Sequence, residues 1–80
     1  MKTKVIFRKF ILGDVVALFP ELLGGRGNDG EQFIGSYMHV GQHSDASPRL
    51  IESLSPATAA EYSALKDELV SIGYELEVQS

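Results

Sequence analysis

The sequence contains no cysteine and no tryptophan, and none of its apolar runs is long. Without cysteine, neither disulfides nor thiolate metal sites can form. The apolar runs fall far short of the roughly 20 residues that a membrane-spanning helix needs. Arg8 and Lys9 interrupt the first of these runs, so we expect no signal peptide. Together, these features predict a cytoplasmic protein that does not enter the membrane.

The chain is short and acidic overall. Its 80 residues, 44% of them hydrophobic, suit a single domain spanning 1–80. A domain of this size buries only about 60% of its unfolded surface, so good packing or self-association must compensate for the missing disulfides. The formal net charge of −4 argues against broad binding to nucleic acids, which attract basic surfaces.

The charge is unevenly distributed along the chain. The first ten residues hold no acid but four cations, which are Lys2, Lys4, Arg8 and Lys9. Nucleic-acid binding through this basic first strand is therefore one alternative function. A simpler explanation is that the first strand lies beside an acidic last strand. The ion pairs expected between them join Lys4 and Arg8 to Glu75 and Glu77, each worth roughly 0.2–1 kcal/mol.

Two segments rich in β-branched and aromatic residues, 4–10 and 14–19, predict a β-hairpin. The Gly-Asp pair at 13–14 supplies turn chemistry, so the two strands should be antiparallel. Ile11 and Leu12 are unusual here, because they place two apolar side chains at the expected tip of the turn.

The middle of the chain is rich in glycine. Residues 21–35 contain five of the eight glycines, and we expect them to form a flexible surface loop. The run 24–30 resembles a phosphate-binding loop only in glycine content, because it lacks the Gly-Lys-Ser/Thr ending. Residues 36–42 predict a third strand. The segment 49–54 fits either a short edge strand or an irregular arm.

The last third of the sequence predicts a helix followed by a strand. Thr58 and Glu61 match a capping box, with Thr58 at the start of the helix. Gly73 is suited to end it, and residues 74–78 then alternate apolar with acidic side chains, as in a strand with one buried face. The apolar stripe of the helix consists of Tyr62, Leu65, Leu69 and Ile72.

The resulting order, β-β-β-α-β, predicts a small α+β domain with a mainly antiparallel sheet and one helix packed on one face. Alternation along the strands assigns to the helix-facing side Val5, Phe7, Val15, Ala17, Phe19, Met38, Val40, Leu76 and Val78. A single helix cannot cover the apolar residues left on the opposite side, which are Ile6, Val16, Leu18, Tyr37 and His39.

An apolar face with a charged rim is typical of an interface. Three occupants fit it: an identical subunit in a homodimer, another macromolecule, or the chain's own loop through residues 33–34. The leading hypothesis is a small binding or accessory module that acts through protein–protein contact on the face opposite the helix. Its candidate contact residues are Ile6, Arg8, Val16, Leu18, Tyr37, His39, His43 and Asp45.

The alternative is a small enzyme or ligand-binding domain centred on Tyr37, His39, His43 and Asp45. Four residues along a strand span about 13 Å, so His39 and His43 cannot share one metal ion. Nucleophilic catalysis needs an adjacent base and an oxyanion site, and the sequence indicates neither. We therefore favour a protein without catalytic residues, metal ions or cofactors.

Three segments share a pattern with other proteins. They are Lys-Val-Ile-Phe-Arg-Lys at 4–9, Gly-Asp-Val-Val-Ala-Leu-Phe-Pro at 13–20 and Ser-Tyr-Met-His-Val-Gly-Gln-His at 36–43. With much of 58–74, they resemble a family of short uncharacterised proteins from bacterial genomes, phages and mobile elements. No activity is assigned to that family, so the resemblance implies no catalytic or binding residues. It directs attention to residues 36–45, whose polar side chains are not required by packing alone.

Overall fold

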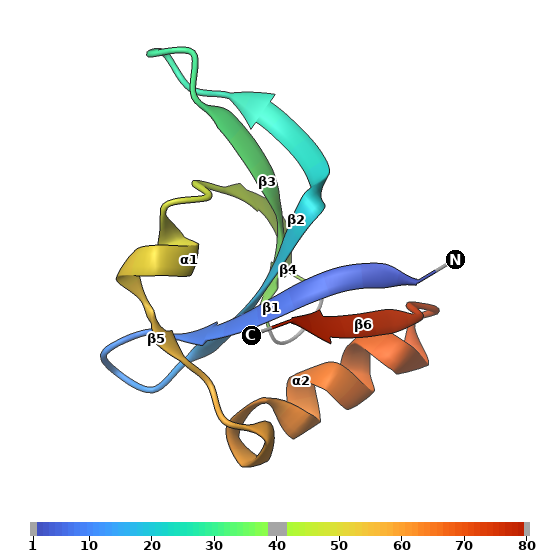
Figure 1. Cartoon of the computed structure of the whole chain (residues 1–80). Helices are drawn as coiled ribbons and strands as arrows, with labels where there is room; N and C mark the ends of the chain where they lie inside the picture. Colours follow the sequence, from blue (N-terminus) through green and yellow to red (C-terminus); the bar gives the residue numbers. More distant parts are fainter. Residues whose placement is uncertain (1, 39–41, 80) are drawn as a thin grey trace.

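The computed structural model describes residues 2–38 and 42–79 (Figure 1). Within them, the helices are α1 (Leu50–Ser53) and α2 (Ala59–Ser71). None of the helices in this part of the chain has the length and apolar character needed to cross a bilayer. The strands are β1 (Thr3–Lys9), β2 (Val15–Arg26), β3 (Gln32–Met38), β4 (Gln42–Ala46), β5 (Ser55–Pro56) and β6 (Leu76–Gln79).

Strand β1 lies in the interior of the sheet and is paired on both sides (Figure 1). One edge pairs antiparallel with β2, and the sheet continues through β3 to β4. The other edge is divided, because β6 runs parallel to residues 3–6 while β5 pairs antiparallel with Arg8 and Lys9. The described strands therefore form a six-stranded, mainly antiparallel sheet, which together with α2 confirms the predicted α+β class.

The hairpin between β1 and β2 forms as predicted. Gly13 N donates to Phe10 O over 2.8 Å, and Phe10 N donates to Asp14 O over 2.8 Å. Gly13 has a φ of 98°, a conformation in which any side chain would be strained. The turn therefore depends on its glycine, and it leaves Ile11 and Leu12 at the tip.

Residues 21–35 do not form the long irregular loop expected from their glycines. Strands β2 and β3 occupy all of this segment except residues 27–31. Their register shifts between Phe19 and Leu23, so β2 accommodates its additional residues in a bulged stretch. Glycine predicts loops because it is conformationally free, but within this ribbon it allows backbones and side chains to approach closely.

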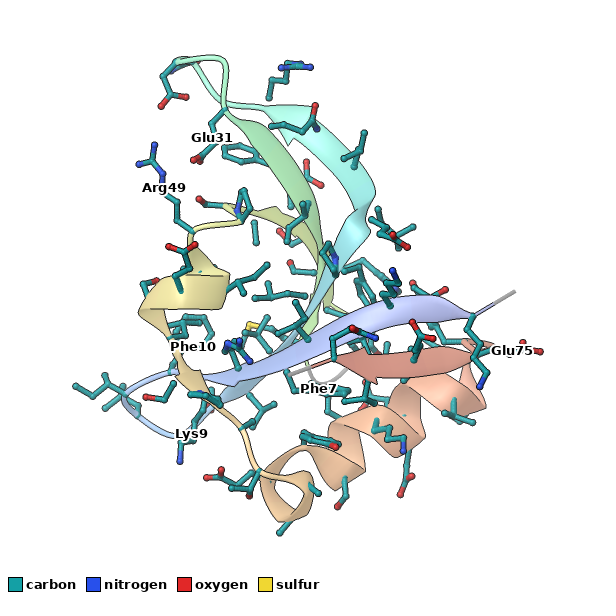
Figure 2. All side chains as sticks on the ribbon, in the orientation of Figure 1. Phe7, Lys9, Phe10, Glu31, Arg49 and Glu75 are labelled. Carbon is teal, nitrogen blue, oxygen red and sulfur yellow. The ribbon has the colours of Figure 1, made fainter. Side chains whose placement is uncertain are left out.

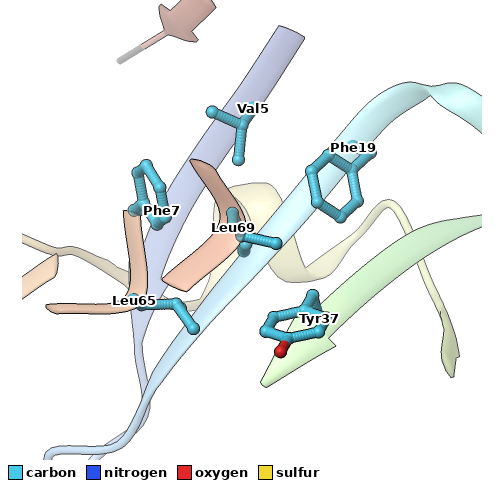
Figure 3. Close-up of a cluster of buried hydrophobic side chains, with 7 residues drawn as sticks. Val5, Phe7, Phe19, Tyr37, Leu65 and Leu69 are labelled. Atoms are coloured by element: carbon cyan, nitrogen blue, oxygen red, sulfur yellow. The ribbon is translucent and has the colours of Figure 1, made fainter. Parts of the chain in front are cut away.

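Helix α2 covers one face of the sheet, over a core that Figure 3 shows in close-up. Phe7 stacks on Tyr62 with 4.3 Å between ring centroids. Tyr37 also faces α2, whereas Met38 packs on the other side of the sheet. The predicted orientation of the third strand is therefore wrong, because both residues can be buried and alternation alone does not choose between them. The buried side chains of this first core are Val5, Phe7, Ala17, Phe19, Tyr37, Leu65 and Leu69.

The opposite face of the sheet is covered by the chain itself. Its buried residues, here called the second core, are Ile6, Val16, Leu18 and Ile34. The segment 46–54 folds over this face (Figure 1). Within it, residues 49–54, expected to be an edge strand or an irregular arm, instead contain the short helix α1. The apolar face left open in the sequence-based prediction is therefore closed. The side chains packed against it are Phe10, Met38, Ala46, Leu50, Ile51 and Leu54.

The basic first strand and the acidic last strand are neighbours, as expected, with Lys4 opposite Glu77. The ion pair formed by Lys4, however, is with Glu21 of β2. Arg8 lies beyond the end of the pairing between β1 and β6, which stops where Ile6 meets Gln79. Its Nε donates instead to the carbonyl oxygen of Ile51 in α1, over 2.8 Å. The predicted pairing of Arg8 with a glutamate of β6 is therefore wrong.

The capping box that begins α2 is confirmed. Glu61 N donates to Thr58 Oγ1 over 3.2 Å, and Thr58 N donates to Glu61 Oε1 over 2.9 Å. Glu61 Oε2 also lies 2.5 Å from Lys9 Nζ, which ties the helix start to β1. The hydrogen bond from Lys9, followed by the one from the Thr58 backbone, lowers the pKa of Glu61 to about 2. At the other end, Gly73 has a φ of 114°, which suits a glycine that ends a helix.

Replacing Glu61 with glutamine should remove a pH-dependent contribution to stability. The pKa of Glu61 is about 2 in the fold and 4.5 ordinarily, so the carboxylate stabilises the fold at neutral pH. That contribution is lost as the pH falls from about 4.5 to about 2. We expect Glu61→Gln to lower the melting temperature at neutral pH, by an amount that shrinks over this interval, in thermal unfolding followed by circular dichroism. Asp67→Asn, on the exposed side of α2, is the control. A difference that is constant with pH would contradict the assignment.

Replacing Leu18 with alanine tests whether the second core belongs to a single chain. Leu18 is 0% exposed, and truncation of such a residue costs about 2–5 kcal/mol. We expect this loss in denaturant unfolding, with midpoints that do not depend on protein concentration. Val70→Ala, at a side chain that is 52% exposed, should cost less than about 0.5 kcal/mol. Unfolding that depends on concentration would show that a second chain covers this face.

Candidate functional site

The residues predicted to contact a partner protein are mostly part of the fold's interior. Ile6, Val16 and Leu18 are 8%, 3% and 0% exposed and pack beneath the segment that contains α1. Tyr37 is 1% exposed and lies in the first core, on the other side of the sheet. Arg8 is buried as well. The face opposite the helix therefore does not present these side chains to a partner.

Tyr37 and His43, two residues of the predicted ligand site, do come together. They are opposite each other in the β3–β4 register, and their rings meet edge to face with 4.6 Å between centroids. The Tyr37 hydroxyl donates to Glu68 Oε2, and His43 Nε2 lies 3.0 Å from the Tyr74 hydroxyl. We call these four residues, Tyr37, His43, Glu68 and Tyr74, the tyrosine–histidine cluster. Glu68 belongs to α2 and Tyr74 lies shortly after that helix. The cluster therefore connects β3 and β4 to the helix layer.

Asp45 is engaged elsewhere. Its Oδ2 accepts a hydrogen bond from Gly25 N over 2.9 Å. Gly24 packs so closely that a Cβ there would lie 2.3 Å from Asp45 Oδ1. The Gln32 side-chain amide donates to the Gly24 carbonyl over 2.8 Å. Asp45 thus anchors the bulged stretch of β2, and His39 lies outside the described residues.

The tyrosine–histidine cluster is suited to a structural role. The Tyr37 hydroxyl bonds to the Glu68 carboxylate, so the hydroxyl of this buried tyrosine has a partner. The exposed His43 imidazole bonds separately to the Tyr74 hydroxyl. Nucleophilic catalysis would also need a nucleophile beside the imidazole and donors for an oxyanion. Across residues 2–38 and 42–79, no three potential metal ligands lie together.

Three of the four cations near the start of the chain are engaged within it, and the fourth, Lys2, is exposed. Lys4 Nζ lies 3.4 Å from Glu21 Oε2, and Lys9 Nζ is bonded to Glu61. Arg8 is only 8% exposed. Nucleic-acid binding through this strand would need a basic surface, and little of that surface remains unpaired and exposed.

The tip of the β1–β2 hairpin is the most exposed apolar part of the described chain. Ile11 is 101% exposed and Leu12 is 90% exposed. The sequence already signals this feature, because both residues directly precede the Gly-Asp turn. The unexpected part is that none of the described residues buries them.

A cavity of about 330 Å³ opens at the divided edge of β1. Its walls come from β1, β5, the start of α2 and the end of β6. The sequence could not predict it, because these segments meet only through the sheet topology. The residues that matter for its chemistry are Phe7, Arg8, Ala59, Tyr62 and Val78.

Comparison with models of known protein families matched none of them, and comparisons with curated proteins and solved structures found no significant similarity. The resemblance noted in the sequence therefore stays a prediction. The candidate sites rest on the geometry of this chain alone.

A double-mutant cycle can test the contact between Asp45 and the bulge in β2. Gly24→Ala should displace the Asp45 carboxylate and cost about 1 kcal/mol, the value of a typical hydrogen bond. In the Asp45→Ala background the same change should cost much less, because the obstructing carboxylate is gone. We expect a coupling of about 0.5–3 kcal/mol from denaturant unfolding. Additive losses would show that the two residues act independently.

Proposed function

We propose that this protein is a small binding module that acts through contact with another protein. The hairpin tip, Ile11 and Leu12, is the part that enters the partner. The supporting observation is the exposure of these two side chains, 101% and 90%. Burying one leucine or isoleucine contributes about 1.5–3 kcal/mol. Burial of these two side chains in an apolar pocket on a partner would therefore favour binding.

The base of the hairpin turn is fixed by contacts with the rest of the fold. Two backbone hydrogen bonds close the turn, and Phe10 packs against the second core. Lys9 is tied to α2 through Glu61. Figure 2 shows Lys9 and Phe10 at the base of the turn. An anchor that is already ordered loses little conformational entropy when it binds, which favours the hairpin tip over a mobile loop as a contact element.

The chemistry of the tip defines the partner as a protein with an apolar pocket. Two such side chains supply about 3–6 kcal/mol of burial at most, and a Kd of 1 mM already requires about 4 kcal/mol. The tip alone therefore supports a weak contact, and tighter binding needs the neighbouring surface of β5. We also propose the cytoplasm, the compartment predicted from the sequence, as the place of this contact.

Substituting both tip residues with serine tests the proposal. Tagged wild-type protein and Ile11→Ser/Leu12→Ser are used as baits in extracts of the native host. We expect a partner retained by the wild type to be lost by the variant, and its affinity, measured with the purified partner, to fall by at least about tenfold. Sedimentation of the wild type alone distinguishes a second copy of this chain from a different protein.

The matched control is Val70→Ser/Ile72→Ser, which removes two apolar side chains that are each 52% exposed at the end of α2. This control should retain the partner. Because Ile11 and Leu12 contact little of the fold, the tip variant should change stability by less than about 0.5 kcal/mol. Equal retention of partners by the tip variant and the wild type would refute the proposal.

A further inference from the structure

The outer edge of β1 is interrupted by a gap. Strand β6 pairs with β1 only as far as Ile6, and β5 begins to pair at Arg8. Between them lies Phe7, whose carbonyl oxygen accepts from Ala57 N over a long 3.3 Å. The cavity of about 330 Å³ opens at this gap, near the lower end of the volumes typical of small-molecule sites, about 300–1,000 Å³.

Arg8, which lines this cavity, is a buried cation for which the described residues supply no counter-charge. It is 8% exposed, and a guanidinium keeps its charge at physiological pH. Its Nε donates to Ile51 O over 2.8 Å and its Nη1 to Phe7 O over 3.2 Å. Within residues 2–38 and 42–79, no carboxylate forms an ion pair with it. A buried charge that is not neutralised is costly to the fold.

Three surface cations of the same chain differ from Arg8 in this respect. Lys4, Lys9 and Arg49 are all more exposed, and each has a carboxylate partner within 3.4 Å or less. Figure 2 shows one of these pairs, Arg49 and Glu31, at the rim of the molecule. Arg8, the buried cation that would gain most from a negative partner, instead donates its hydrogen bonds to backbone carbonyls.

One amino group of the Arg8 guanidinium remains available. Nε and Nη1 make the two hydrogen bonds to carbonyls, and Nη2 takes part in neither. No side-chain nitrogen in the described chain is both buried and unpaired, so Nη2 keeps contact with solvent. Because a guanidinium presents its donors in a planar fork, the free group is suited to a carboxylate or phosphate oxygen.

The cavity also has apolar walls, beside the polar side chain of Gln79. Phe7 and Tyr62 stack with an interplanar angle of 9°. Val78, predicted to be buried under the helix, is instead 37% exposed and lines the cavity with Ala59. A bare inorganic anion would leave these surfaces in water, whereas a ligand with a small apolar body would cover them.

We propose that this cavity binds a small organic acid. The carboxylate lies on the free side of the Arg8 guanidinium, and the apolar body lies against Tyr62 and Val78. The site uses neither residue of the hairpin tip and shares only β5 with the proposed protein contact, through Pro56, so benzoate binding does not depend on Ile11 or Leu12. The ligand supplies from solution the negative charge that the described residues do not provide for Arg8.

Binding of benzoate, measured by calorimetry and by the melting temperature, tests the proposal. Benzamide has the same shape without the charge, and inorganic phosphate has the charge without the apolar body. We expect benzoate to bind at least about tenfold more tightly than either, a difference of about 1.4 kcal/mol. No binding of millimolar benzoate, or equal binding of benzamide, would overturn the proposal. If phosphate binds as tightly as benzoate, the cavity is a general anion site, and its assignment to an organic acid is overturned.

A variant that places a negative charge in the cavity completes the test. Ala59→Glu puts a carboxylate at the first position of α2, where an acidic residue favours the helix, so the variant should fold. Ala60→Glu is the matched control, because Ala60 is exposed on the same turn and does not line the cavity. We expect Ala59→Glu to weaken benzoate binding by at least about tenfold and Ala60→Glu to leave it nearly unchanged. Equal effects of the two substitutions would locate benzoate elsewhere and refute the site.

Arg8→Gln should also abolish benzoate binding. Circular dichroism checks that the chain remains folded after losing the hydrogen bond from Arg8 to Ile51 in α1.

Discussion

The double burial of β1 is the constraint on which the rest of the structure depends. Val5 and Phe7 point into the core under α2, while Ile6 points into the second core on the other side. A strand with apolar residues on both faces needs a covering layer on each. Helix α2 supplies one layer and the segment 46–54 supplies the other. Each of these layers then determines how the next strand, β6 or β5, reaches the free edge of β1.

The parts of the fold that the sequence predicts are those encoded by neighbouring residues. The β1–β2 hairpin follows from its Gly-Asp turn, and α2 follows from the capping box of Thr58 and Glu61 and from Gly73. These signals act over a few residues, where backbone conformation and local hydrogen bonds decide the outcome. The acidic last strand could also be placed beside the basic first strand, because opposite charges on adjacent strands are favourable neighbours.

The remaining features depend on contacts between distant segments. Whether Tyr37 or Met38 faces the helix is decided by packing against α2 and α1, since both side chains tolerate burial. The glycines near residue 24 belong to a strand because Asp45 and Gln32 hold that backbone in place. Arg8, expected beside a glutamate, turns to α1 because β6 ends before reaching it. The cavity beside Arg8 exists only through this topology, so no local pattern could reveal it.

The parallel pairing of β1 with β6 also determines how the molecule responds to mechanical force. Thr3 and Leu76 begin the paired segment and Ile6 and Gln79 end it, so the chain enters the pair at one end and leaves it at the other. Tension applied along the chain would therefore pull the two strands past each other lengthwise. The hydrogen bonds between them would share the load and fail together rather than opening one by one. Resistance to forced unfolding is governed by such a barrier rather than by overall stability, and in this small domain it resides in four residues of each strand.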